Sequence, residues 1–325
     1  MKKHLITGGA GFIGSTLAKS LLADGDDVTV VDNLETGSLE NLDGARGHER
    51  FHFVEGDICD TRLMDELTSK ADVVEHLAAR IGLQIIIGQA HKTLQTNVKG
   101  TEIVLEAAAK YGCRTILAST SEVYGLTERI PSSEEDPIVF GSPMKSRWSY
   151  ACGKALDEFW GLALHREQNL PATVVRLFNT VGPRQSARYG MVLPRFVRQA
   201  LAGEPLTVYG DGSQTRCFCY VGDVVGALKD ILVNDATIGE LYNLGNPQET
   251  TILNLAKRVI NLTESRSKIE FVPYSKAYGD GFEEIMRRVP DITKLRAAIG
   301  FKPQTSLDEI IRSVIVSLND IQLVA

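Results

Sequence analysis

The apolar residues at the start of the chain change from a short run to a helical spacing across a glycine-rich segment. Residues 4–7 form the run, residues 8–15 carry the glycines, and apolar residues recur at helical spacing from Leu17 onward. A second apolar run at residues 28–31 closes on Asp32. The pattern predicts a strand, a glycine loop, a helix and a second strand that ends in an acidic residue.

This order of elements is typical of dinucleotide binding. Glycines allow the backbone to approach a pyrophosphate, which the positive N-terminus of the following helix attracts. Asp32 lies about 20 residues further on, where a carboxylate accepts hydrogen bonds from the adenosine ribose. That carboxylate would repel a 2′-phosphate, so the sequence predicts NAD rather than NADP.

Strand-like and helical segments continue to alternate beyond this unit. Apolar runs predict further strands at residues 51–54, 73–79, 115–119 and 172–177. Residues 93–111 have the spacing of a helix. Asp57 follows the third strand, where it suits an adenine edge, and the small Ala78 and Ala79 leave room for the cofactor. We therefore expect an α/β, Rossmann-type doubly wound parallel sheet that forms an NAD-binding domain over residues 1–179.

The pattern becomes more varied after residue 180. Helices are predicted at residues 193–201, 252–262 and 306–318, and strands at residues 206–209, 215–221 and 241–245. We expect residues 180–325 to form a smaller C-terminal α/β domain that binds the substrate, with some segments returning to the Rossmann sheet. Several arginines here are either solvated surface charges or a cluster that holds a diphosphate: Arg184, Arg188, Arg195, Arg198 and Arg216.

Composition and charge exclude several classes of partner. The 325 residues carry a net charge of −6 and no long basic run, which argues against nucleic acid. No apolar stretch reaches the roughly 18 residues that span a bilayer, and the N-terminal run stops in glycines, so neither membrane binding nor a signal peptide is expected. The five cysteines are scattered, which suggests a reducing compartment and a cytoplasmic protein. Cys217 and Cys219 have no second ligand cluster, so no metal is expected.

The candidate chemistry lies in residues 119–154. Tyr150 precedes Lys154 by one helical turn. A phenol titrates near about pH 10, but a neighbouring cation favours the phenolate, so the pair is a candidate general base. Two hydroxyls and a carboxylate follow the preceding strand: Thr120, Ser121 and Glu122. Ligands of open α/β sheets bind beyond the carboxyl ends of the strands, which would bring these groups to the cofactor. The alternative is an ordinary helix pair without a catalytic role.

Short motifs recur along the whole chain, at residues 7–14, 76–79, 150–154, 176–179, 182–184 and 209–216. Together they resemble the extended branch of the short-chain dehydrogenase/reductase family, whose epimerases, dehydratases and decarboxylases act on nucleotide sugars. Further segments resemble UDP-glucuronic acid decarboxylases, at residues 119–125, 145–150, 277–283 and 287–292. The resemblance implies an NAD-dependent enzyme that works through a 4-keto sugar.

The resemblance also implies a set of site residues. The expected catalytic residues are Thr120, Ser121, Glu122, Tyr150, Lys154 and Arg288. The expected NAD contacts are Gly8, Gly11, Phe12, Ile13, Gly14, Asp32, Asn33, Asp57, Ile58, Leu77, Ala78, Ala79, Asn97, Ser119, Tyr150 and Lys154. The expected contacts of the nucleotide sugar, most simply a UDP sugar, are Asn179, Arg184, Val192, Arg195, Tyr209, Arg216 and Arg288.

In the implied mechanism, Tyr150 takes the proton of the sugar 4-hydroxyl while C4 gives its hydride to NAD. Lys154 lowers the pKa of Tyr150, and Thr120 donates a hydrogen bond at O4. If C5 carries a carboxylate, the 4-ketone is a β-keto acid that loses CO₂. Glu122 would then move protons at C5, and Arg288 would supply positive charge. The product is UDP-xylose, or the 4-keto pentose if release precedes hydride return.

Three other outcomes stay open. In 4-epimerisation of UDP-glucose or UDP-glucuronate, the 4-keto sugar turns over and takes the hydride on its other face. In 4,6-dehydration, Glu122 acts as the acid that expels the 6-hydroxyl. The third outcome is a non-enzymatic NAD-binding scaffold, which the presence of Thr120, Tyr150 and Lys154 disfavours.

Two further features bear on substrate and assembly. Residues 80–87 are not the small, polar or aromatic residues that the resemblance implies beside a hexuronate, and Ala90 stands where many of the resembled enzymes have proline, so the sugar stays open. The helices expected at residues 93–111 and 149–167 have broad apolar faces. In the resembled family such helices form a dimer interface, so we expect a homodimer; the alternative is that both faces belong to the core.

Overall fold

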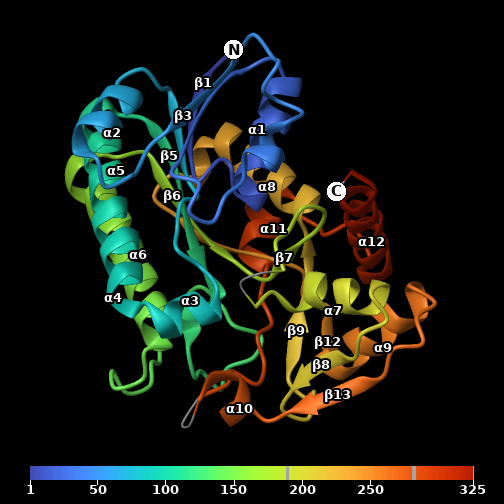
Figure 1. Cartoon of the computed structure of the whole chain (residues 1–325). Helices are drawn as coiled ribbons and strands as arrows, with labels where there is room; N and C mark the ends of the chain where they lie inside the picture. Colours follow the sequence, from blue (N-terminus) through green and yellow to red (C-terminus); the bar gives the residue numbers. More distant parts are fainter. Residues whose placement is uncertain (188–189, 280–282, 325) are drawn as a thin grey trace.

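A seven-stranded parallel sheet lies at the centre of the computed structural model, which describes residues 1–187, 190–279 and 283–324 (Figure 1). In spatial order the strands are β11 (Leu241–Leu244), β6 (Ala172–Leu177), β5 (Arg114–Thr120), β4 (Val73–His76), β1 (Lys3–Thr7), β2 (Asp27–Asp32) and β3 (Phe51–Glu55). Near-continuous apolar runs suit strands that are buried on both faces. The predicted α/β Rossmann-type fold is confirmed.

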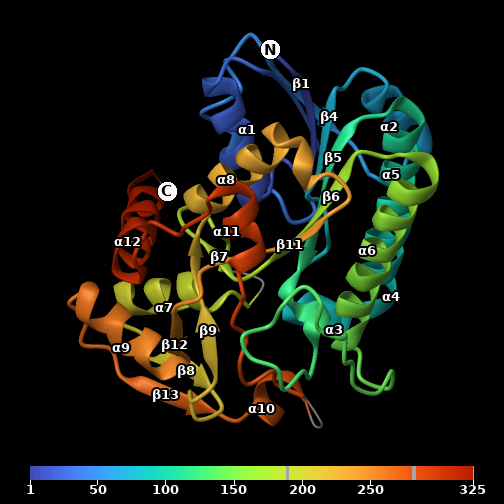
Figure 2. The same cartoon turned by 180° about the vertical axis from the view of Figure 1, so that it is seen from behind.

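Two groups of helices cover the two faces of this sheet. One group is α2 (Thr61–Thr68), α5 (Gly100–Tyr111) and α6 (Trp148–Gln168). Figure 2 shows the other group from behind, which is α1 (Phe12–Ala23), α8 (Val221–Val233) and α11 (Thr293–Ile299). Successive residues of a strand point to opposite faces, so Leu5 packs in the first core and Ile6 in the second.

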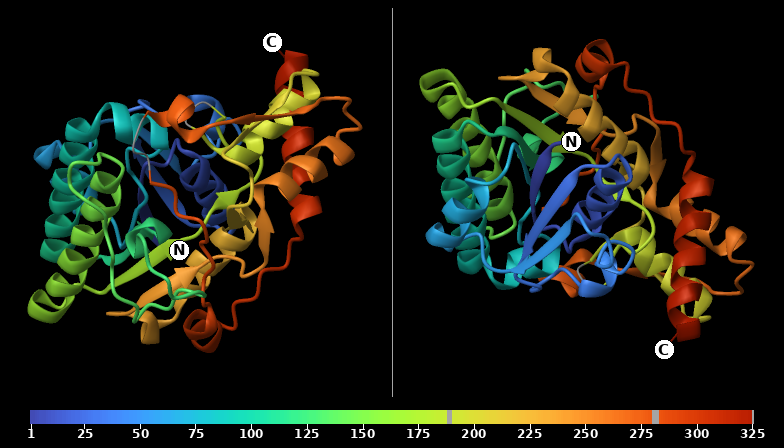
Figure 3. Two further views of the ribbon diagram at one scale, coloured as in Figure 1. Left: turned by 90° about the horizontal axis from the view of Figure 1, so that it is seen from below. Right: turned by 90° about the horizontal axis from the view of Figure 1, so that it is seen from above.

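The second half of the chain builds a smaller body beside the sheet (Figure 3). Its elements are α7 (Val192–Leu201), α9 (Ile252–Leu262), α12 (Leu307–Val324), the strand pair β8 (Leu206–Tyr209) and β13 (Ile269–Val272), and the strand pair β9 (Thr215–Cys217) and β12 (Glu249–Thr251). A separate apolar core, which includes Phe196, Leu255 and Ile311, holds these elements together. Because β11 joins the large sheet instead, the chain crosses between the two bodies after residue 180.

Short elements complete the fold. They are α3 (Leu83–Gly88), α4 (Ala90–Leu94), α10 (Tyr274–Tyr278), the parallel pair β7 (Thr180–Val181) and β10 (Cys219–Tyr220), and the 3-10 helices Leu39–Leu42, Ser121–Tyr124 and Asp235–Thr237. The sequence pattern did not predict α2, α8 or α11. No helix within the described ranges is long and apolar enough to cross a membrane.

Two predicted elements are interrupted in the structure. The helix expected at residues 93–111 consists of α4, a π-helical turn at Gln95–Lys99, and α5. The π turn directs Asn97 at the backbone of Arg80, with which its side chain makes two hydrogen bonds (2.7 and 3.2 Å). The strand expected at residues 215–221 is divided at Phe218, which is buried in the core of the smaller body. The strands on either side of it pair with different partners.

Candidate active site

A cavity of about 460 Å³ opens where the carboxyl ends of the sheet strands face the smaller body. Its walls come from the ends of β1, β2, β4, β5 and β6, from the start of α6, and from α7 and β8. Ligands of open α/β sheets bind at this edge. The cavity therefore brings together the two halves of the site that the sequence predicts.

The glycine loop after β1 is packed so closely against the protein backbone that side chains do not fit at two of its positions. Gly8 has a φ of +69°, and a Cβ atom there would lie 2.7 Å from the Cα atom of Ala78. A Cβ atom on Gly14 would lie 2.5 Å from the carbonyl oxygen of Gly8. The loop leads directly into α1, whose N-terminus lies at the cavity. These backbone positions fit a dinucleotide.

The carboxylate of Asp32 braces this loop from the end of β2. It accepts hydrogen bonds from the backbone N–H groups of Ala10 (3.0 Å) and Leu34 (2.8 Å). Burial raises the pKa of Asp32, and these two hydrogen bonds oppose that rise. The side chain is thus held at the cavity wall in the position that the sequence predicts for a ribose ligand.

Most of the predicted NAD contacts line this cavity. Those that do are Gly8, Gly11, Phe12, Ile13, Gly14, Asp32, Asn33, Ile58, Leu77, Ala78, Ala79, Ser119, Tyr150 and Lys154. Asp57 is exposed beside Asn33, whose side-chain amide donates a hydrogen bond to it (3.2 Å). Asn97 is fully buried behind Arg80. These last two residues support the wall rather than form it.

The predicted catalytic residues converge from three separate segments. Thr120 ends β5, Ser121 and Glu122 start the 3-10 helix that follows, Tyr150 and Lys154 lie in the first turns of α6, and Arg288 comes from the extended segment after α10. All six line the cavity. The backbone N–H of Glu122 donates to the hydroxyl oxygen of Thr120 (3.2 Å), which fixes the turn after the strand.

The pKa of Tyr150 differs from the prediction. The sequence predicts that Lys154 lowers it, but burial and then the charge of Glu122 raise the pKa of this phenol. A hydrogen bond with Thr120 and the charge of Arg288 oppose that rise. The ammonium of Lys154 is held instead by Asp157, with 3.0 Å between Nζ and Oδ2. In the protein alone, the phenol is therefore kept protonated.

Positive charge gathers at the end of the cavity beyond Tyr150. The guanidinium of Arg288 pairs with Glu122 (Nη1 to Oε1, 3.3 Å). Desolvation, together with the neighbouring charges of Arg216 and Arg147, lowers the pKa of Arg288 to about 10. Arg216 pairs in turn with Glu284 (2.7 Å). Guanidinium groups arranged in this way suit an anionic ligand.

Two segments that resemble decarboxylases meet at the rim of this region. The carboxylate of Glu283 accepts hydrogen bonds from Lys145 Nζ (2.5 Å) and from the indole N–H of Trp148 (2.8 Å). The guanidinium of Arg147 stacks 5.1 Å from the ring of Trp148. Residues 280–282 of the same motif lie outside the described residues. The contacts with Glu283 connect the start of α6 to the segment that carries Arg288.

The predicted sugar-nucleotide contacts also line the cavity, namely Asn179, Arg184, Val192, Arg195, Tyr209, Arg216 and Arg288. Arg195 lies over the ring of Tyr209, 4.3 Å from its centroid. Arg184 reaches back to Thr16 on α1 (3.3 Å), so it lies at the border with the glycine loop. Arg198 is exposed on the outer face of α7, and Arg188 lies outside the described residues. Only part of the predicted arginine cluster thus faces the site.

Several residues of the site were not singled out from the sequence. Arg80 is almost fully buried at the cavity wall, where it pairs with Glu35 from the loop after β2. It also donates a hydrogen bond to Gln89 (2.6 Å). Glu35 is bound by Lys92 as well (2.6 Å). The only signal for this group was that residues 80–87 depart from the resembled enzymes.

Metal-ligating side chains do not cluster in residues 1–187, 190–279 or 283–324, where no group of three or more His, Cys, Asp or Glu residues could hold an ion. Cys217 and Cys219 are buried on β9 and β10, and burial raises the pKa of the Cys217 thiol to about 12.

Comparison with known proteins places the chain among enzymes with this architecture. The family described as GDP-mannose 4,6 dehydratase matches residues 5–314. A UDP-N-acetyl-alpha-D-glucosaminuronate decarboxylase from Bacillus cytotoxicus is 43% identical over 323 residues, which cover 99% of this chain and 99% of the relative. UDP-glucuronic acid decarboxylase 1 from Danio rerio is 40% identical over 308 residues, which cover 95% of this chain and 70% of the relative.

Solved structures agree with this relationship. A UDP-glucose 4-epimerase from Thermus thermophilus, solved in complex with NAD, has a TM-score of 0.85 and 28% sequence identity. The similarity covers 98% of this chain and 99% of that one. The matches extend over both bodies of the molecule. The chain belongs to the GDP-mannose 4,6-dehydratase family and is an extended short-chain dehydrogenase/reductase, an enzyme of nucleotide sugars.

Proposed function

We propose that this protein is an NAD-dependent decarboxylase of a UDP-linked hexuronate, most simply UDP-glucuronate. The observation that carries the proposal is the Glu122–Arg288 pair (3.3 Å), which lies beside Tyr150 at the arginine-rich end of the cavity. A carboxylate that can carry protons and a guanidinium that can hold an anion are both needed at C5 of such a sugar. The names of two relatives, which are decarboxylases of UDP-linked hexuronates, support it.

The cavity fits NAD as the cofactor. The tight loop at Gly8 and Gly14, which leads into the N-terminus of α1, suits the pyrophosphate, and Asp32 suits the hydroxyls of the adenosine ribose. Ala78 and Lys154 line the wall further along, where the nicotinamide ribose would lie. When bound, NAD would supply the acceptor for the hydride of sugar C4 and the source of the hydride that returns to it. The proposal assigns the smaller body, with Arg195, to the nucleotide diphosphate.

Tyr150 is the proposed base for the 4-hydroxyl of the sugar. Its phenol is buried at the cavity wall and hydrogen-bonded to Thr120, so both hydroxyls face one point. Burial raises the pKa of Tyr150, so the phenolate requires additional positive charge in the loaded site. Thr120 then donates a hydrogen bond to O4 as its charge develops.

The proposed decarboxylation breaks the bond between C5 and the carboxylate carbon. The 4-ketone makes the sugar a β-keto acid, so the electron pair of the broken bond passes into C5 and O4 as an enolate while CO₂ leaves. Thr120 and the protonated Tyr150 stabilise the enolate oxygen. Glu122 or Ser121 carries a proton to C5, and Arg288 holds the carboxylate until it departs. Return of the hydride to C4 gives UDP-xylose, and earlier release gives the 4-keto pentose.

The second candidate is 4-epimerisation, which the structural similarity to a UDP-glucose 4-epimerase favours. Epimerisation needs space for the 4-keto sugar to turn, and it needs no group at C5. The Glu122–Arg288 pair lies at the sugar end without a role in such a reaction. A 4,6-dehydration would use Glu122 as an acid, but it has no use for an anion-binding guanidinium. The pair therefore favours decarboxylation over both.

The decisive experiment is product analysis by NMR after incubation with NAD and a panel of UDP-glucuronate, UDP-N-acetylglucosaminuronate, UDP-glucose and UDP-N-acetylglucosamine. We expect loss of the C6 carbon from one of the two uronates and no change in the neutral sugars. The 2-acetamido uronate is included because the Bacillus cytotoxicus relative is named for it. Inversion at C4 or loss of the 6-hydroxyl in a neutral sugar, without carbon loss from a uronate, would contradict the proposal.

Glu122→Gln sharpens the same test. The amide keeps the shape of the side chain at the cavity but cannot carry a proton. A decarboxylase should lose product by about 10²- to 10⁴-fold while it still reduces NAD. An epimerase should be affected much less, so comparable epimerase activity in the variant would favour the second candidate.

We further propose that the protein is a homodimer through the outer face of α6. Cys152, Leu156 and Phe159 lie on one side of this helix and are exposed, Phe159 at 66%. Sedimentation should give a dimer for the wild type and a monomer for Phe159→Glu. A wild-type monomer would overturn this assignment.

A further inference from the structure

The ammonium of Lys154 is half of a buried ion pair within α6. Its Nζ atom donates a hydrogen bond to Asp157 Oδ2 at 3.0 Å, and the two side chains are only 3% and 1% exposed. The residues are three apart on one helix, so the pair forms on one side of it. A buried ammonium needs such a partner, because an uncompensated charge in the interior is strongly unfavourable. Asp157 itself does not line the cavity; it lies behind Lys154.

A line of hydrogen bonds runs from Asp157 to the glycine loop. Thr101 Oγ1 of α5 donates to Asp157 Oδ2 (3.2 Å), and His76 Nε2 of β4 lies 2.9 Å from Thr101 Oγ1. His76 Nδ1 lies 2.8 Å from Thr7 Oγ1, which accepts a hydrogen bond from the backbone N–H of Ala78 (3.3 Å). The side chains from Thr7 to Asp157 are all buried. The line therefore links the ion pair to the base of the cofactor site.

The direction of each bond follows from the carboxylate. Since the Thr101 hydroxyl donates to Asp157, its oxygen accepts from His76, which must carry its proton on Nε2. His76 Nδ1 then accepts from the hydroxyl of Thr7. Desolvation, and then the charge of Lys154, holds the pKa of His76 well below its ordinary value, which agrees with a neutral ring. Every donor in the line thus points toward Asp157.

The neighbouring carboxylate on α6 is already satisfied. Glu158 pairs with Arg176 through two hydrogen bonds (2.9 and 2.7 Å) and accepts a third from Ser119 (2.5 Å). Its charge is therefore compensated on the other side of the helix. Asp157 is left as the negative group that faces Lys154.

We propose that Asp157 is a positioning residue that compensates the charge of Lys154, so that the site accepts the cationic ring of oxidised NAD beside a fixed ammonium. The inference rests on the proposed function, because that function places the nicotinamide ribose at Lys154. Like charges close together repel strongly in a buried site. A carboxylate held by Lys154 and Thr101 weakens this repulsion for the oxidised cofactor, while the neutral ring of the reduced cofactor is indifferent to it.

The primary test compares cofactor affinities without any sugar. Titration calorimetry on Asp157→Asn should show that the ratio of the dissociation constants for oxidised and reduced cofactor rises on the order of tenfold over the wild type. The amide keeps the shape and can still accept from Thr101 and Lys154, so the change is mainly one of charge. Asp157→Ser is a second neutral variant that serves if the amide is not tolerated.

Glu75→Gln is the matched control, since it neutralises another fully buried carboxylate, on β4 and away from the cavity. It should leave the ratio unchanged. An unchanged ratio in Asp157→Asn, or an equal loss of both affinities, would mean a purely structural role and would overturn the proposal. Failure of both neutral variants to fold would overturn it as well. If the wild type binds neither form of the cofactor, the proposed function fails too, which is a separate and recognisable result.

The pH profile supplies a second readout. Three charged groups act on the Tyr150 phenol: Glu122 after β5, Asp157 on α6 and Arg288 from the C-terminal segment. Removal of the Asp157 charge favours the phenolate, so the acid limb of sugar oxidation should move to lower pH by about half to one unit in Asp157→Asn. A limb that stays in place, or that moves equally in Glu75→Gln, would contradict the proposal.

Discussion

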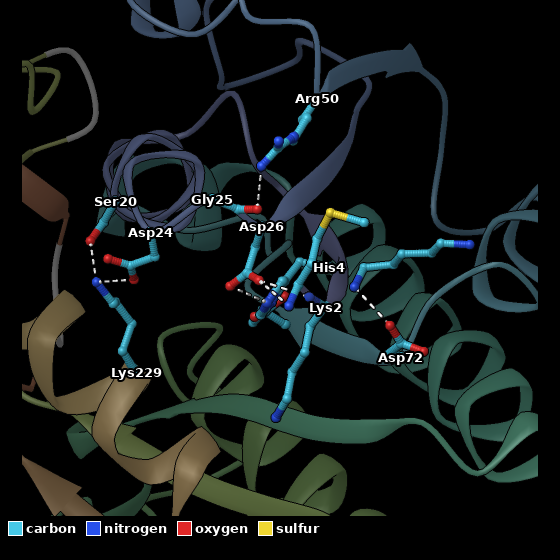
Figure 4. A network of polar contacts seen from close by, with 12 residues as sticks. Lys2, His4, Ser20, Asp24, Gly25, Asp26, Arg50, Asp72 and Lys229 are labelled. Atoms are coloured by element: carbon cyan, nitrogen blue, oxygen red, sulfur yellow. Dashed lines mark hydrogen bonds and ion pairs between the residues drawn. The ribbon is translucent and has the colours of Figure 1, made fainter.

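We call the end of the sheet at the amino ends of its strands the amino edge and the opposite end the carboxyl edge. Each edge holds a buried histidine, and the two histidines have opposite surroundings. His4 lies on β1 near the amino ends of the strands, and His76 ends β4 at the carboxyl edge. Figure 4 shows the amino edge, where His4 lies beside Asp26. The carboxylate of Asp26 also accepts a hydrogen bond from the backbone N–H of Lys2. Both imidazoles are buried in the same sheet, so their different chemistry must come from their neighbours.

His4 is surrounded by carboxylates. Its Nδ1 atom lies 2.6 Å from Glu75 Oε1, and its Nε2 atom lies 3.4 Å from Asp26 Oδ2. Burial alone would lower the pKa of His4, but the hydrogen bond and charge of Glu75, together with Asp26, outweigh it and raise the pKa. This edge therefore stabilises a charged histidine, and the contacts tie β1 to β4 and to the start of β2.

Among the described residues, the direct partners of His76 are the hydroxyls of Thr7 and Thr101, and the charge that acts on it is the ammonium of Lys154. The carboxyl edge thus keeps its histidine neutral and orients hydroxyl donors toward Asp157. The comparison shows how one sheet separates its tasks. At the amino edge a histidine joins β1 to β4 and to the start of β2 through carboxylates, and at the edge where the cavity opens a neutral histidine belongs to the hydrogen-bonded line that ends at the Lys154–Asp157 pair.

The largest expected effect is a loss of turnover, and it concerns the carboxyl edge alone. Tyr150→Phe removes the proposed base, so turnover should fall by about 10²- to 10⁴-fold. The phenol lines the cavity and the ring stays, so the melting temperature and NAD binding should change little. Steady-state kinetics with calorimetric NAD titration measures both. A variant that keeps most of its activity would show that the base is another group.

The next effect is a loss of stability, and it concerns the amino edge alone. Glu75→Gln removes the carboxylate that partners His4, and the free energy of unfolding should fall by about 1–3 kcal/mol. Activity per folded molecule should stay the same, because Glu75 is remote from the cavity lining. Urea unfolding and kinetics on one preparation test both parts. Loss of activity without loss of stability would contradict the division of tasks between the edges.

A smaller effect concerns the response of His76 to acid. Its pKa is lowered in the fold, so below the ordinary value of 6.5 the unfolded chain binds a proton that the folded chain does not. Stability from this residue is therefore present above pH 6.5 and lost as the pH falls, by up to ~1.4 kcal/mol per pH unit. His76→Gln should show a shallower acid decline in urea unfolding. An identical slope would mean that His76 is protonated in the fold.

The smallest effect has the opposite sign and belongs to His4. Because its pKa is raised in the fold, the stability it contributes is present below pH 6.5 and is lost as the pH rises through the raised value. His4→Gln should therefore flatten the alkaline side of the stability curve and leave the acid side as it is. If both histidine variants changed the pH dependence of stability in the same direction, the contrast between the two edges would be contradicted.

Much of the fold follows from short-range patterns in the sequence. The glycine loop, Asp32 and the strands from β1 to β6 are encoded in runs and spacings of a few residues, and most of their observed bounds lie close to the predicted ones. The exceptions are instructive. The π turn at Gln95–Lys99 has the spacing of an ordinary helix in the sequence, and it directs Asn97 at the backbone of Arg80, 17 residues away. Helices α2, α8 and α11 escaped prediction although each packs on the sheet.

The candidate site also has one part that the sequence predicts and one part that it does not. Tyr150 and Lys154 are one helical turn apart, so their pairing and the type of chemistry are readable from the sequence by itself. The charges that surround these two residues cannot be read from the sequence, because they belong to groups that packing brings together. Arg288 meets Glu122 across 166 residues, and Thr101 meets Asp157 across 56. Periodicity and motif spacing carry no information over such separations.

The sequence by itself determined the sheet, the dinucleotide loop and the Tyr150–Lys154 pair, since local geometry dictates each of them. Only the tertiary structure decided that Lys154 is bound by Asp157, that burial raises the pKa of Tyr150, and that Arg288 lies beside Glu122. The physical reason is that charge and desolvation act through space. They depend on which side chains share a buried volume, whatever their distance along the chain.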